Sequence, residues 1–241
     1  MISGYHANVA EHYEKFPYPS YPWFASASWK QLQAVDCQTW GASHEIKDIW
    51  IAGCGTISPL MFGRRNFMSK ILASDLSESA LQICQRRLRI YGMRNVQLKC
   101  EDIFEANYSE KFDAIDSYGV IHHTVSPVRS LDKLVTALKP GGILRLMVYS
   151  QEAREQIENL RSEVKEKKLS EISDVKKFLA ERVAQPSGDL KNSAGIADAL
   201  LNPIVHTYTR KQFEDLLAAE ARLRVLKIED SKNFVAFCLK L

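Results

Sequence analysis

The chain has 241 residues, 46% of them hydrophobic, and a formal net charge of +3. That apolar content is enough for one sizeable core, and no apolar run approaches the length of a membrane span, so a membrane partner is not expected. Acidic and basic residues are interspersed, and so small an imbalance does not indicate nucleic acid as a partner. The five cysteines lack CxxC spacing and the N-terminus lacks a basic and then apolar leader, which favours a reduced, cytoplasmic location.

The first 45 residues are expected to form an N-terminal strap or lid. Residues 1–15 favour a short helix, whereas residues 16–24, FPYPSYPWF, must be extended because their prolines recur too often for a helix. One interpretation is a strap that packs its rings on the core; the other is a lid whose aromatic faces attract a cation and exclude water. Residues 28–40 have helical spacing and are expected to form one helix that ends before Gly41. The rings of the strap are those of Tyr13, Tyr18, Tyr21 and Trp23.

Residues 48–58, DIWIAGCGTIS, lead from an apolar run into a loop that contains two glycines. The apolar run fits a central parallel strand that is buried on both faces. Gly53 and Gly55 permit backbone conformations that side chains forbid, and they let a ligand lie against the main chain. We therefore expect this loop, with Ala52 and Cys54 included, to bind a nucleoside-bearing cofactor.

A second apolar strand, residues 71–75, ends at Asp75 about twenty residues after this loop, where a carboxylate can bind both hydroxyls of a ribose. This acid suits any cofactor that contains a ribose. A dinucleotide fingerprint also needs a third glycine, at the position where this chain has Ser58 preceded by Ile57. The prediction of a nicotinamide cofactor is therefore weakened, although it stays open at this point.

Residues 112–117, FDAIDS, are expected to be the fourth strand, and open α/β sheets bind their ligands at the carboxyl ends of such strands. Tyr118 and Gly119 follow directly and stand at that edge. Imidazole changes charge near neutral pH, so His122 and His123 are candidates for a catalytic base, although packing or hydrogen bonding alone would also explain them. Adjacent histidines in a turn, without acids at ligand spacing, do not define a metal site.

Residues 127–138 are expected to be a helix, LKPGG a tight turn and residues 143–149 the fifth strand. The last residue of that strand, Tyr149, either enters a ligand pocket or packs in the core. Residues 151–184 mix charge signs at helical spacing, which is typical of a helical insertion with a solvated face. The expected division of the chain is strap 1–45, cofactor-binding core 46–150, helical insertion 151–205 and completion of the core 206–241.

The C-terminal segment is expected to complete the sheet. Thr209 has the chemistry of a cap for a helix over residues 210–219. His206, just before it, is either a pocket residue or a structural histidine. Two strands, residues 223–228 and 233–239, are joined by EDSK, and so short a connection can join only antiparallel neighbours.

Five motifs occur in order between residues 46 and 150: IAGCGT, ASDLSESAL, EDIFE, FDAIDSYGVIHHTVSP and LKPGGILRLMVYS. In this order and spacing they resemble the successive motifs of class I S-adenosylmethionine-dependent methyltransferases, and five ordered matches are far more specific than one. The resemblance is strongest to a subgroup with an IAGCGT loop and a GVxHH motif that is often fused to tetratricopeptide repeats, which do not occur in this sequence. The match continues more loosely to Leu241.

The resemblance implies an α/β, Rossmann-like sheet of seven strands, mostly parallel with a C-terminal antiparallel hairpin, and S-adenosyl-L-methionine as the cofactor. It places Gly53 and Gly55 at the methionine end of that molecule, Asp75 at the ribose, and Asp102 with the backbone amide of Ile103 at the adenine. The expected cofactor-binding residues are Ala52, Gly53, Cys54, Gly55, Asp75, Leu76, Glu101, Asp102, Ile103, Tyr118 and Gly119.

The expected function is methyl transfer to a small-molecule or peptide-like acceptor. Two alternatives stay open: an NAD-dependent oxidoreductase, disfavoured by Ser58 and the terminal hairpin, and a non-catalytic regulatory domain that binds S-adenosylmethionine. Ile57 departs from the glycine that is usual in the family, and the exposed insertion could mediate a homodimer. The catalytic candidates are His122, His123 and Tyr18, and the resemblance favours His122 over His123 by its position in the motif. The acceptor-pocket candidates are Tyr13, Tyr21, Tyr149 and His206.

Overall fold

The computed structural model of the protein describes residues 4–22, 28–230 and 232–241. Its centre is one sheet with the strand order β3-β2-β1-β4-β5-β8-β7, and the short β6 lies beside β5. The strands from β3 to β5 are parallel, and β8 is antiparallel to both β5 and β7. This confirms the expected Rossmann-like α/β fold with a C-terminal antiparallel hairpin. The strands are β1 (Asp48–Ala52), β2 (Lys70–Asp75), β3 (Val96–Cys100), β4 (Phe112–Tyr118), β5 (Leu138–Ser150), β6 (Thr207–Tyr208), β7 (Leu223–Asp230) and β8 (Asn233–Lys240).

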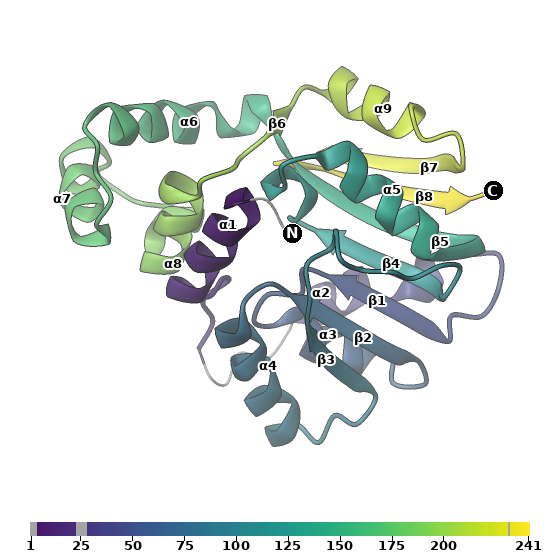
Figure 1. Ribbon diagram of the computed structural model, residues 1–241. Helices are drawn as coiled ribbons and strands as arrows, with labels where there is room; N and C mark the ends of the chain where they lie inside the picture. The colour runs from purple at the N-terminus through teal and green to yellow at the C-terminus, as the bar shows by residue number, and fades with distance from the viewer. Residues whose placement is uncertain (1–3, 23–27, 231) are drawn as a thin grey trace.

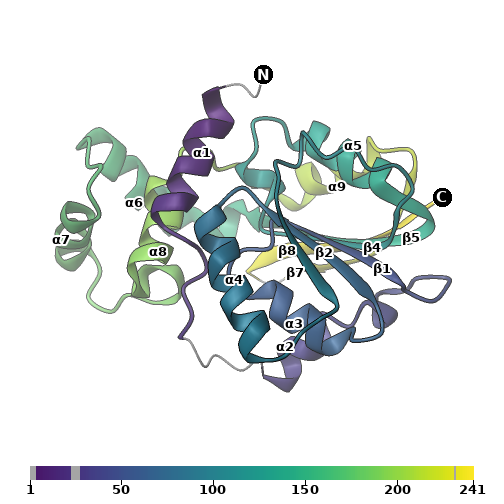
Figure 2. The same cartoon turned by 60° about the horizontal axis from the view of Figure 1, so that its bottom comes forward.

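Helices cover both faces of this sheet, as Figures 1 and 2 show. The sequence of β1 explains why both faces need cover. Trp50 packs in one apolar cluster, whereas Ile49 and Ile51 pack in the other, because successive side chains of a strand point to opposite faces. One face carries α2 (Trp29–Ala34), α3 (Ser58–Arg65) and α4 (Glu78–Ile90), and the other carries α5 (Pro127–Ala137) and α9 (Arg210–Ala218).

The single helix expected over residues 28–40 is wrong, because this segment forms two short helices. After α2 a 3₁₀ helix follows, η1 (Cys37–Trp40). Asp36 lies between them, and its carboxylate accepts a hydrogen bond of 3.3 Å from the backbone N–H of Gln38, which starts the second helix. An acid that bonds its local backbone in this way competes with a continuing helix. Gly41 then ends η1 with a φ of 104°, in the left-handed region that glycine tolerates.

The turn expected in LKPGG lies inside a longer strand than the sequence predicted. β5 pairs with β4 at Leu138 and again from Ile143, so that residues 139–142 form an irregularity within the ladder. Gly141 has a φ of 73° there, which fits a turn. The strand therefore begins before the turn and not after it.

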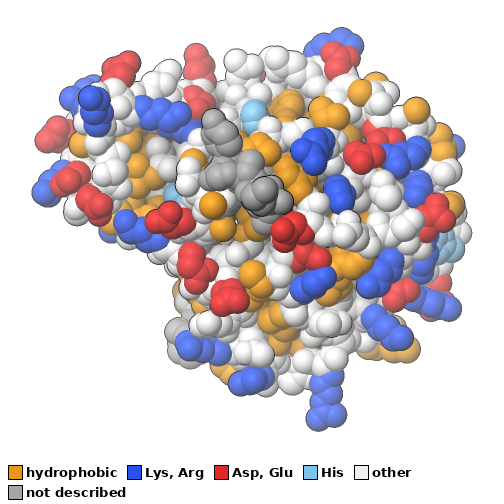
Figure 3. Space-filling view, in the orientation of Figure 1, with side chains coloured by type: hydrophobic (Ala, Val, Ile, Leu, Met, Phe, Trp, Pro, Cys, Tyr) orange, Lys and Arg blue, Asp and Glu red, His pale blue; other side chains and the backbone are white. Residues whose placement is uncertain are grey.

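Residues 151–205 leave the sheet after β5 and form the helical part at the left of Figure 1. This helical part has its own apolar cluster, separate from the two clusters of the sheet, which includes Val164, Val175, Phe178 and Leu200. Figure 3 shows acidic and basic side chains interspersed over the surface of this insertion. No helix in the described part of the chain is both long and apolar enough to cross a membrane. The insertion consists of α6 (Gln151–Glu166), α7 (Ile172–Arg182), η3 (Gly188–Lys191), α8 (Ser193–Ile196) and the π-helical turn η4 (Ala197–Leu201).

The first helix, α1 (Gly4–Lys15), lies between the insertion and α4 (Figures 1 and 2). The carboxylate of Glu14 accepts a hydrogen bond of 3.1 Å from the backbone N–H of Ser79, in the first turn of α4, where the helix dipole favours an acid. On the opposite side, the Tyr13 hydroxyl donates a hydrogen bond of 2.7 Å to Asp198 in η4. These contacts hold α1 as a roof above the carboxyl edge of the sheet.

Candidate active site

A cavity of about 370 Å³ lies at the carboxyl ends of β1, β2 and β4, beneath α1. Its volume is in the range of small-molecule binding sites, and its position is where open α/β sheets bind ligands. Most of the site residues predicted from the sequence line it. These are Tyr13, Tyr18, Tyr21, Gly53, Gly55, Asp75, Leu76, Glu101, Asp102, Ile103, Tyr118, Gly119, His123 and Tyr149.

The glycines of the first loop are required by the protein's own packing. Gly53 and Gly55 have φ values of 75° and 54°, which side chains rarely adopt. A Cβ at Gly53 would lie 2.4 Å from Cγ2 of Val120, and one at Gly55 would lie 2.7 Å from the backbone oxygen of Tyr18. Ile57 also lines the cavity, with a negative φ of −133°, so a side chain is tolerated there without backbone strain. The loop is thus pressed between the strap and the turn after β4.

Asp75 is held at the tip of β2 by backbone amides. Its Oδ2 accepts a hydrogen bond of 2.8 Å from the N–H of Gly55, and its Oδ1 accepts one of 3.0 Å from the N–H of Ser77. Burial raises the pKa of this carboxyl group, and the amide donors partly oppose that shift because they stabilise the charged form. The carboxylate is therefore fixed in position by the same loop that carries the glycines.

Two further acids lie at the tip of β3. Asp102 is buried, and its Oδ1 accepts a hydrogen bond of 2.8 Å from the N–H of Phe104. Glu101 is held by Lys99, at 2.5 Å, and by the hydroxyl of Tyr108, at 2.7 Å. Both acids line the cavity beside Asp75, so the tips of two neighbouring parallel strands supply three carboxylates.

Asp198, in η4, is the centre of the other end of the cavity. The hydroxyl of Tyr13 donates to its Oδ1 at 2.7 Å, and the hydroxyl of Tyr149 donates to its Oδ2 at 3.1 Å. The pKa of each tyrosine is raised, first by burial and then by the charge of Asp198. The sequence placed Asp198 in the insertion without giving it a role. Asp198 belongs to the stretch that loosely resembles the methyltransferase subgroup, and its helical spacing to Asn202, whose amide lies 3.4 Å from the same carboxylate, could have indicated a partner.

His123 stands beside this carboxylate with a defined tautomer. Its Nδ1 lies 2.7 Å from the backbone oxygen of Ile204, and because a carbonyl only accepts, Nδ1 must carry the proton. Nε2 is then the unprotonated nitrogen, 3.9 Å from Oδ1 of Asp198. Burial lowers the pKa of His123 although Asp198 acts in the opposite direction, so the ring is neutral at pH 7. A neutral imidazole with an available lone pair can accept a proton.

Four predicted residues do not line the cavity. Ala52 and Cys54 are buried in the apolar clusters of the sheet. His122 is fully buried against the ring of Tyr149, with the ring centroids 3.9 Å apart, and burial lowers its pKa well below the usual value. His206 lies behind the wall of the cavity, since its Nε2 lies 3.1 Å from the backbone oxygen of Thr124, which does line it. The structure thus places His123, and not His122, at the cavity.

The extended segment after α1 crosses the cavity and is fastened on both sides. The hydroxyl of Tyr18 donates a hydrogen bond of 2.9 Å to Asp189 in the insertion, and burial raises the pKa of this tyrosine. The backbone oxygen of Tyr21 accepts a hydrogen bond of 2.8 Å from Arg87 in α4. Trp23, the fourth ring predicted for this strap, lies outside the described residues. The two tyrosines line the cavity, so the segment forms part of its wall.

A Rossmann-like fold with such a cavity at its strand tips defines a class of nucleoside-binding α/β proteins. A family model described as a methyltransferase domain matches residues 52–208, and the chain belongs to that family. Among curated proteins, the uncharacterized protein syc1184_c from Synechococcus sp. is 34% identical over 118 residues, which make up 47% of this chain and 28% of that protein. The chain thus spans less than a third of that relative's length.

Solved structures agree with this assignment. PKMT2 from Rickettsia typhi has a TM-score of 0.67 at 17% identity, over 92% of this chain and 55% of that chain. The N-methyltransferase NodS from Bradyrhizobium japonicum, in complex with S-adenosyl-L-homocysteine, has a TM-score of 0.58 at 12% identity, over 97% of this chain and 98% of that chain. An S-adenosylmethionine-dependent methyltransferase from Clostridium acetobutylicum reaches 0.58 at 13% identity, over 98% of both chains. Likeness at these identities shows the fold.

Proposed function

We propose that the protein transfers a methyl group from S-adenosylmethionine to a small-molecule or peptide-like acceptor. One observation carries the proposal: a single cavity joins the glycine loop after β1 with Asp75 and Asp102, at the tips of two adjacent parallel strands. PKMT2 and NodS were solved in complex with the demethylated form of this donor. Membership of the subgroup that is often fused to tetratricopeptide repeats stays a prediction.

The residues of the cavity fit this donor. A carboxylate has about four lone-pair sites. Two backbone amides occupy only some of the lone-pair sites of the Asp75 carboxylate, so this acid can still accept hydrogen bonds from ribose hydroxyls. Asp102 and the backbone N–H of Ile103 would recognise the adenine. Leu76, Glu101, Gly53, Gly55, Tyr118 and Gly119 would complete the wall around the ribose and the methionine end.

The chain's own residues would orient the reactants and take up a proton. S-adenosylmethionine would supply a methyl carbon that is activated by positive sulfur. The rings of Tyr13 and Tyr21 suit a cation, because their faces are electron-rich. His123 is the candidate base, since its Nε2 is unprotonated and faces Asp198. Tyr18 is a positioning residue, because its hydroxyl is engaged with Asp189 and its raised pKa keeps it protonated.

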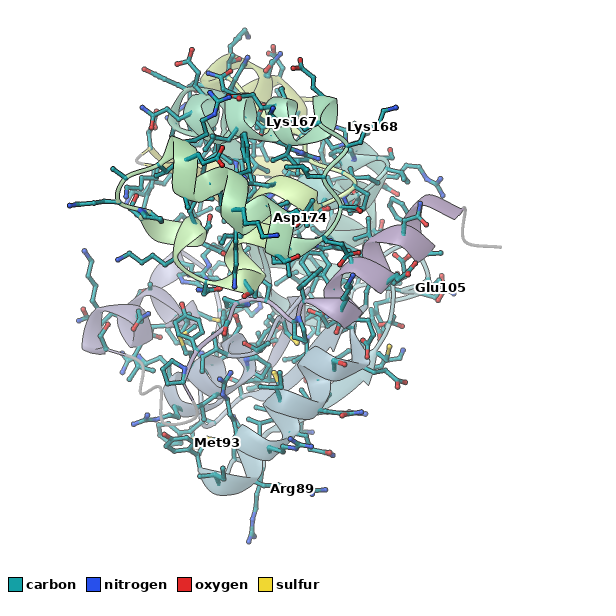
Figure 4. All side chains as sticks on the ribbon, turned by 90° about the vertical axis from the view of Figure 1, so that its left-hand side faces the viewer. Arg89, Met93, Glu105, Lys167, Lys168 and Asp174 are labelled. Carbon is teal, nitrogen blue, oxygen red and sulfur yellow. The ribbon has the colours of Figure 1, made fainter. Side chains whose placement is uncertain are left out.

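Calorimetric titration with S-adenosylhomocysteine and with NAD tests the proposal. We expect S-adenosylhomocysteine to bind and NAD to give no heat, and Asp75→Asn to weaken the binding by about tenfold or more, because a buried charge that accepts two hydrogen bonds is lost. Glu105→Gln is the matched control, since Glu105 is exposed and lies at the margin of the molecule in Figure 4. Binding of NAD alone would reverse the proposal in favour of an oxidoreductase.

A second candidate function is a non-catalytic domain that binds S-adenosylmethionine. Mass spectrometry distinguishes it from a methyltransferase. Pools of candidate acceptors are incubated with the protein and the donor, and a mass increment of one methyl group is sought. The neutral His123 at the cavity favours a catalytic protein. Persistent absence of the increment, with S-adenosylhomocysteine bound, would favour the regulatory alternative. A homodimer through the insertion and a cytoplasmic location remain predictions.

A further inference from the structure

The lining of the cavity is acidic. Among the described residues that line it, there is no lysine or arginine. Under the proposed function, three of the lining acids stand around the donor, whereas Asp189 and Asp198 come from the insertion and stand at the acceptor end. The carboxylates that line the cavity are those of Asp75, Glu101, Asp102, Asp189 and Asp198.

Asp198 is a buried carboxylate without a lysine or arginine partner in the part of the chain that the structure describes. It is 1% exposed. Its hydrogen bonds come from neutral groups: the hydroxyls of Tyr13 and Tyr149, and the amide of Asn202. A charge buried among neutral donors keeps most of its field and is strongly stabilised by a cation. The site is therefore suited to a ligand that brings a positive charge.

Two buried arginines, Arg154 and Arg161, lie near this end of the cavity, and neither lines it. Arg161 lies 3.8 Å from Glu158 and donates a hydrogen bond of 2.6 Å to the backbone oxygen of Asn202, and its charge also interacts with that of Asp198. The guanidinium of Arg154 lies 3.7 Å from the ring centre of Tyr149, and one of its nitrogens lies 3.8 Å from Asp189. Arg154 thus offsets part of the charge of Asp189, and Arg161 part of that of Asp198, but neither guanidinium forms an ion pair or a hydrogen bond with Asp198.

An independent observation points to the same ligand. His123 is 5% exposed, and Nδ1 is bonded to Ile204. Nε2 faces Asp198 from beyond hydrogen-bond distance, at 3.9 Å, and none of the described residues donates a hydrogen bond to it. A buried nitrogen whose lone pair has no donor, in the wall of a cavity, is suited to a ligand that brings an N–H.

We propose that the methyl acceptor is an amine, which binds as its ammonium form beside Asp198 and Asp189 and is enclosed by the rings of Tyr13, Tyr18 and Tyr149. This inference rests on the proposed function. Both carboxylates attract the ammonium charge, and aromatic faces add to that attraction. An acceptor that carries a carboxylate or phosphate at this position would meet two acids and be repelled.

The same residues account for the protons and electrons of the transfer. The ammonium gives one proton to Nε2 of His123, and Asp198 stabilises the imidazolium so formed. The nitrogen lone pair then forms a bond with the methyl carbon as the carbon–sulfur bond breaks, and sulfur keeps the electron pair and becomes neutral. The product leaves as a protonated methylamine, and the imidazolium loses its proton to water.

Calorimetry with three probes of equal length tests this inference: hexylamine, 1-hexanol and hexanoate, each titrated at pH 7 into the protein saturated with S-adenosylhomocysteine. We expect hexylamine to bind about tenfold more tightly than hexanol, and hexanoate to give no heat. Asp189→Asn retains an oxygen for the Tyr18 hydroxyl and removes only the charge, and it should weaken hexylamine by about threefold to tenfold without changing hexanol. Asp198→Asn should weaken hexylamine more.

The matched control is Asp174→Asn, on the same insertion but half-exposed, where Figure 4 shows it on the outer helices. It should leave all three affinities unchanged. Equal binding of hexanol and hexylamine, or no loss in Asp189→Asn, would overturn the inference while S-adenosylhomocysteine binding still supports the proposed function. Failure of S-adenosylhomocysteine to bind would overturn both. Asp198 is buried, so Asp198→Asn could disturb folding. If that variant is unfolded, the result for Asp189→Asn alone decides.

Discussion

The two ends of the cavity are built in different ways. At the donor end, backbone amides of Gly55 and Ser77 hold Asp75, so the site follows from the path of parallel strands and their loops. At the acceptor end, side chains hold Asp198, and its partners Tyr13 and Tyr149 lie 185 and 49 residues away in the sequence. Strand tips and their loops thus provide the donor end, whereas contacts between side chains far apart in the sequence provide the acceptor end.

The largest effect of a substitution is expected at His123, at the acceptor end. His123→Asn keeps a donor for the backbone oxygen of Ile204 but removes the unprotonated Nε2, and it should lower kcat by about 10²- to 10⁴-fold. Affinity for S-adenosylhomocysteine should not change, because this residue belongs to the acceptor end. The measurement is steady-state kinetics with an amine acceptor, together with calorimetry.

His206→Asn is the matched control, since His206 does not line the cavity and its ring contacts only the backbone oxygen of a lining residue, Thr124. Its kcat should stay within about threefold of the natural protein. An equal loss of kcat in the two variants would mean that His123 acts through the structure alone and accepts no proton.

A smaller effect, on stability, should distinguish Gly55, which is packed against the strap, from Gly92, which has open space around it. Gly55→Ala combines a φ of 54° with a Cβ that would lie 2.7 Å from the backbone oxygen of Tyr18. We expect it to lower the free energy of unfolding by about 2–3 kcal/mol and to weaken S-adenosylhomocysteine binding. Gly92→Ala has a similar φ of 66° but meets nothing within 4 Å, so about 1 kcal/mol is expected. Urea titrations of both variants test this, and equal losses would contradict the close approach of the strap.

The sequence predicted the donor end because its residues follow strands in contiguous motifs. Asp75 and the glycines could be placed from the apolar runs that precede them. The role of Asp198 could not be predicted, since a π-helical turn in an insertion has no periodic signal that indicates what it faces. The resemblance favoured His122, whereas His123 lines the cavity, because adjacent residues in a turn differ only in the direction that tertiary packing imposes.

The last prediction concerns pH and the histidines on and beside α1. Burial lowers the pKa of His12 to about 4, and it also lowers the pKa values of His122 and His123. Between about pH 6.5 and 4 the unfolded chain binds protons that the folded chain refuses, so stability is full above 6.5 and falls as pH decreases. Each group contributes up to about 1.4 kcal/mol per pH unit.

Urea midpoints between pH 7.5 and 4.5 measure this decline, and His12→Asn should make the curve shallower. A midpoint that stays constant over the range would contradict the burial of neutral histidines. A curve equally steep in His12→Asn would assign the decline to other groups.

The most direct test of the account is a crystal structure of the protein with S-adenosylhomocysteine. We expect the ribose hydroxyls on the carboxylate of Asp75, the adenine beside Ile103, and the sulfur directed toward the space enclosed by His123 and Asp198. Density for the ligand outside this cavity, or a sulfur directed away from His123, would contradict the central claim that the two ends form one methyl-transfer site.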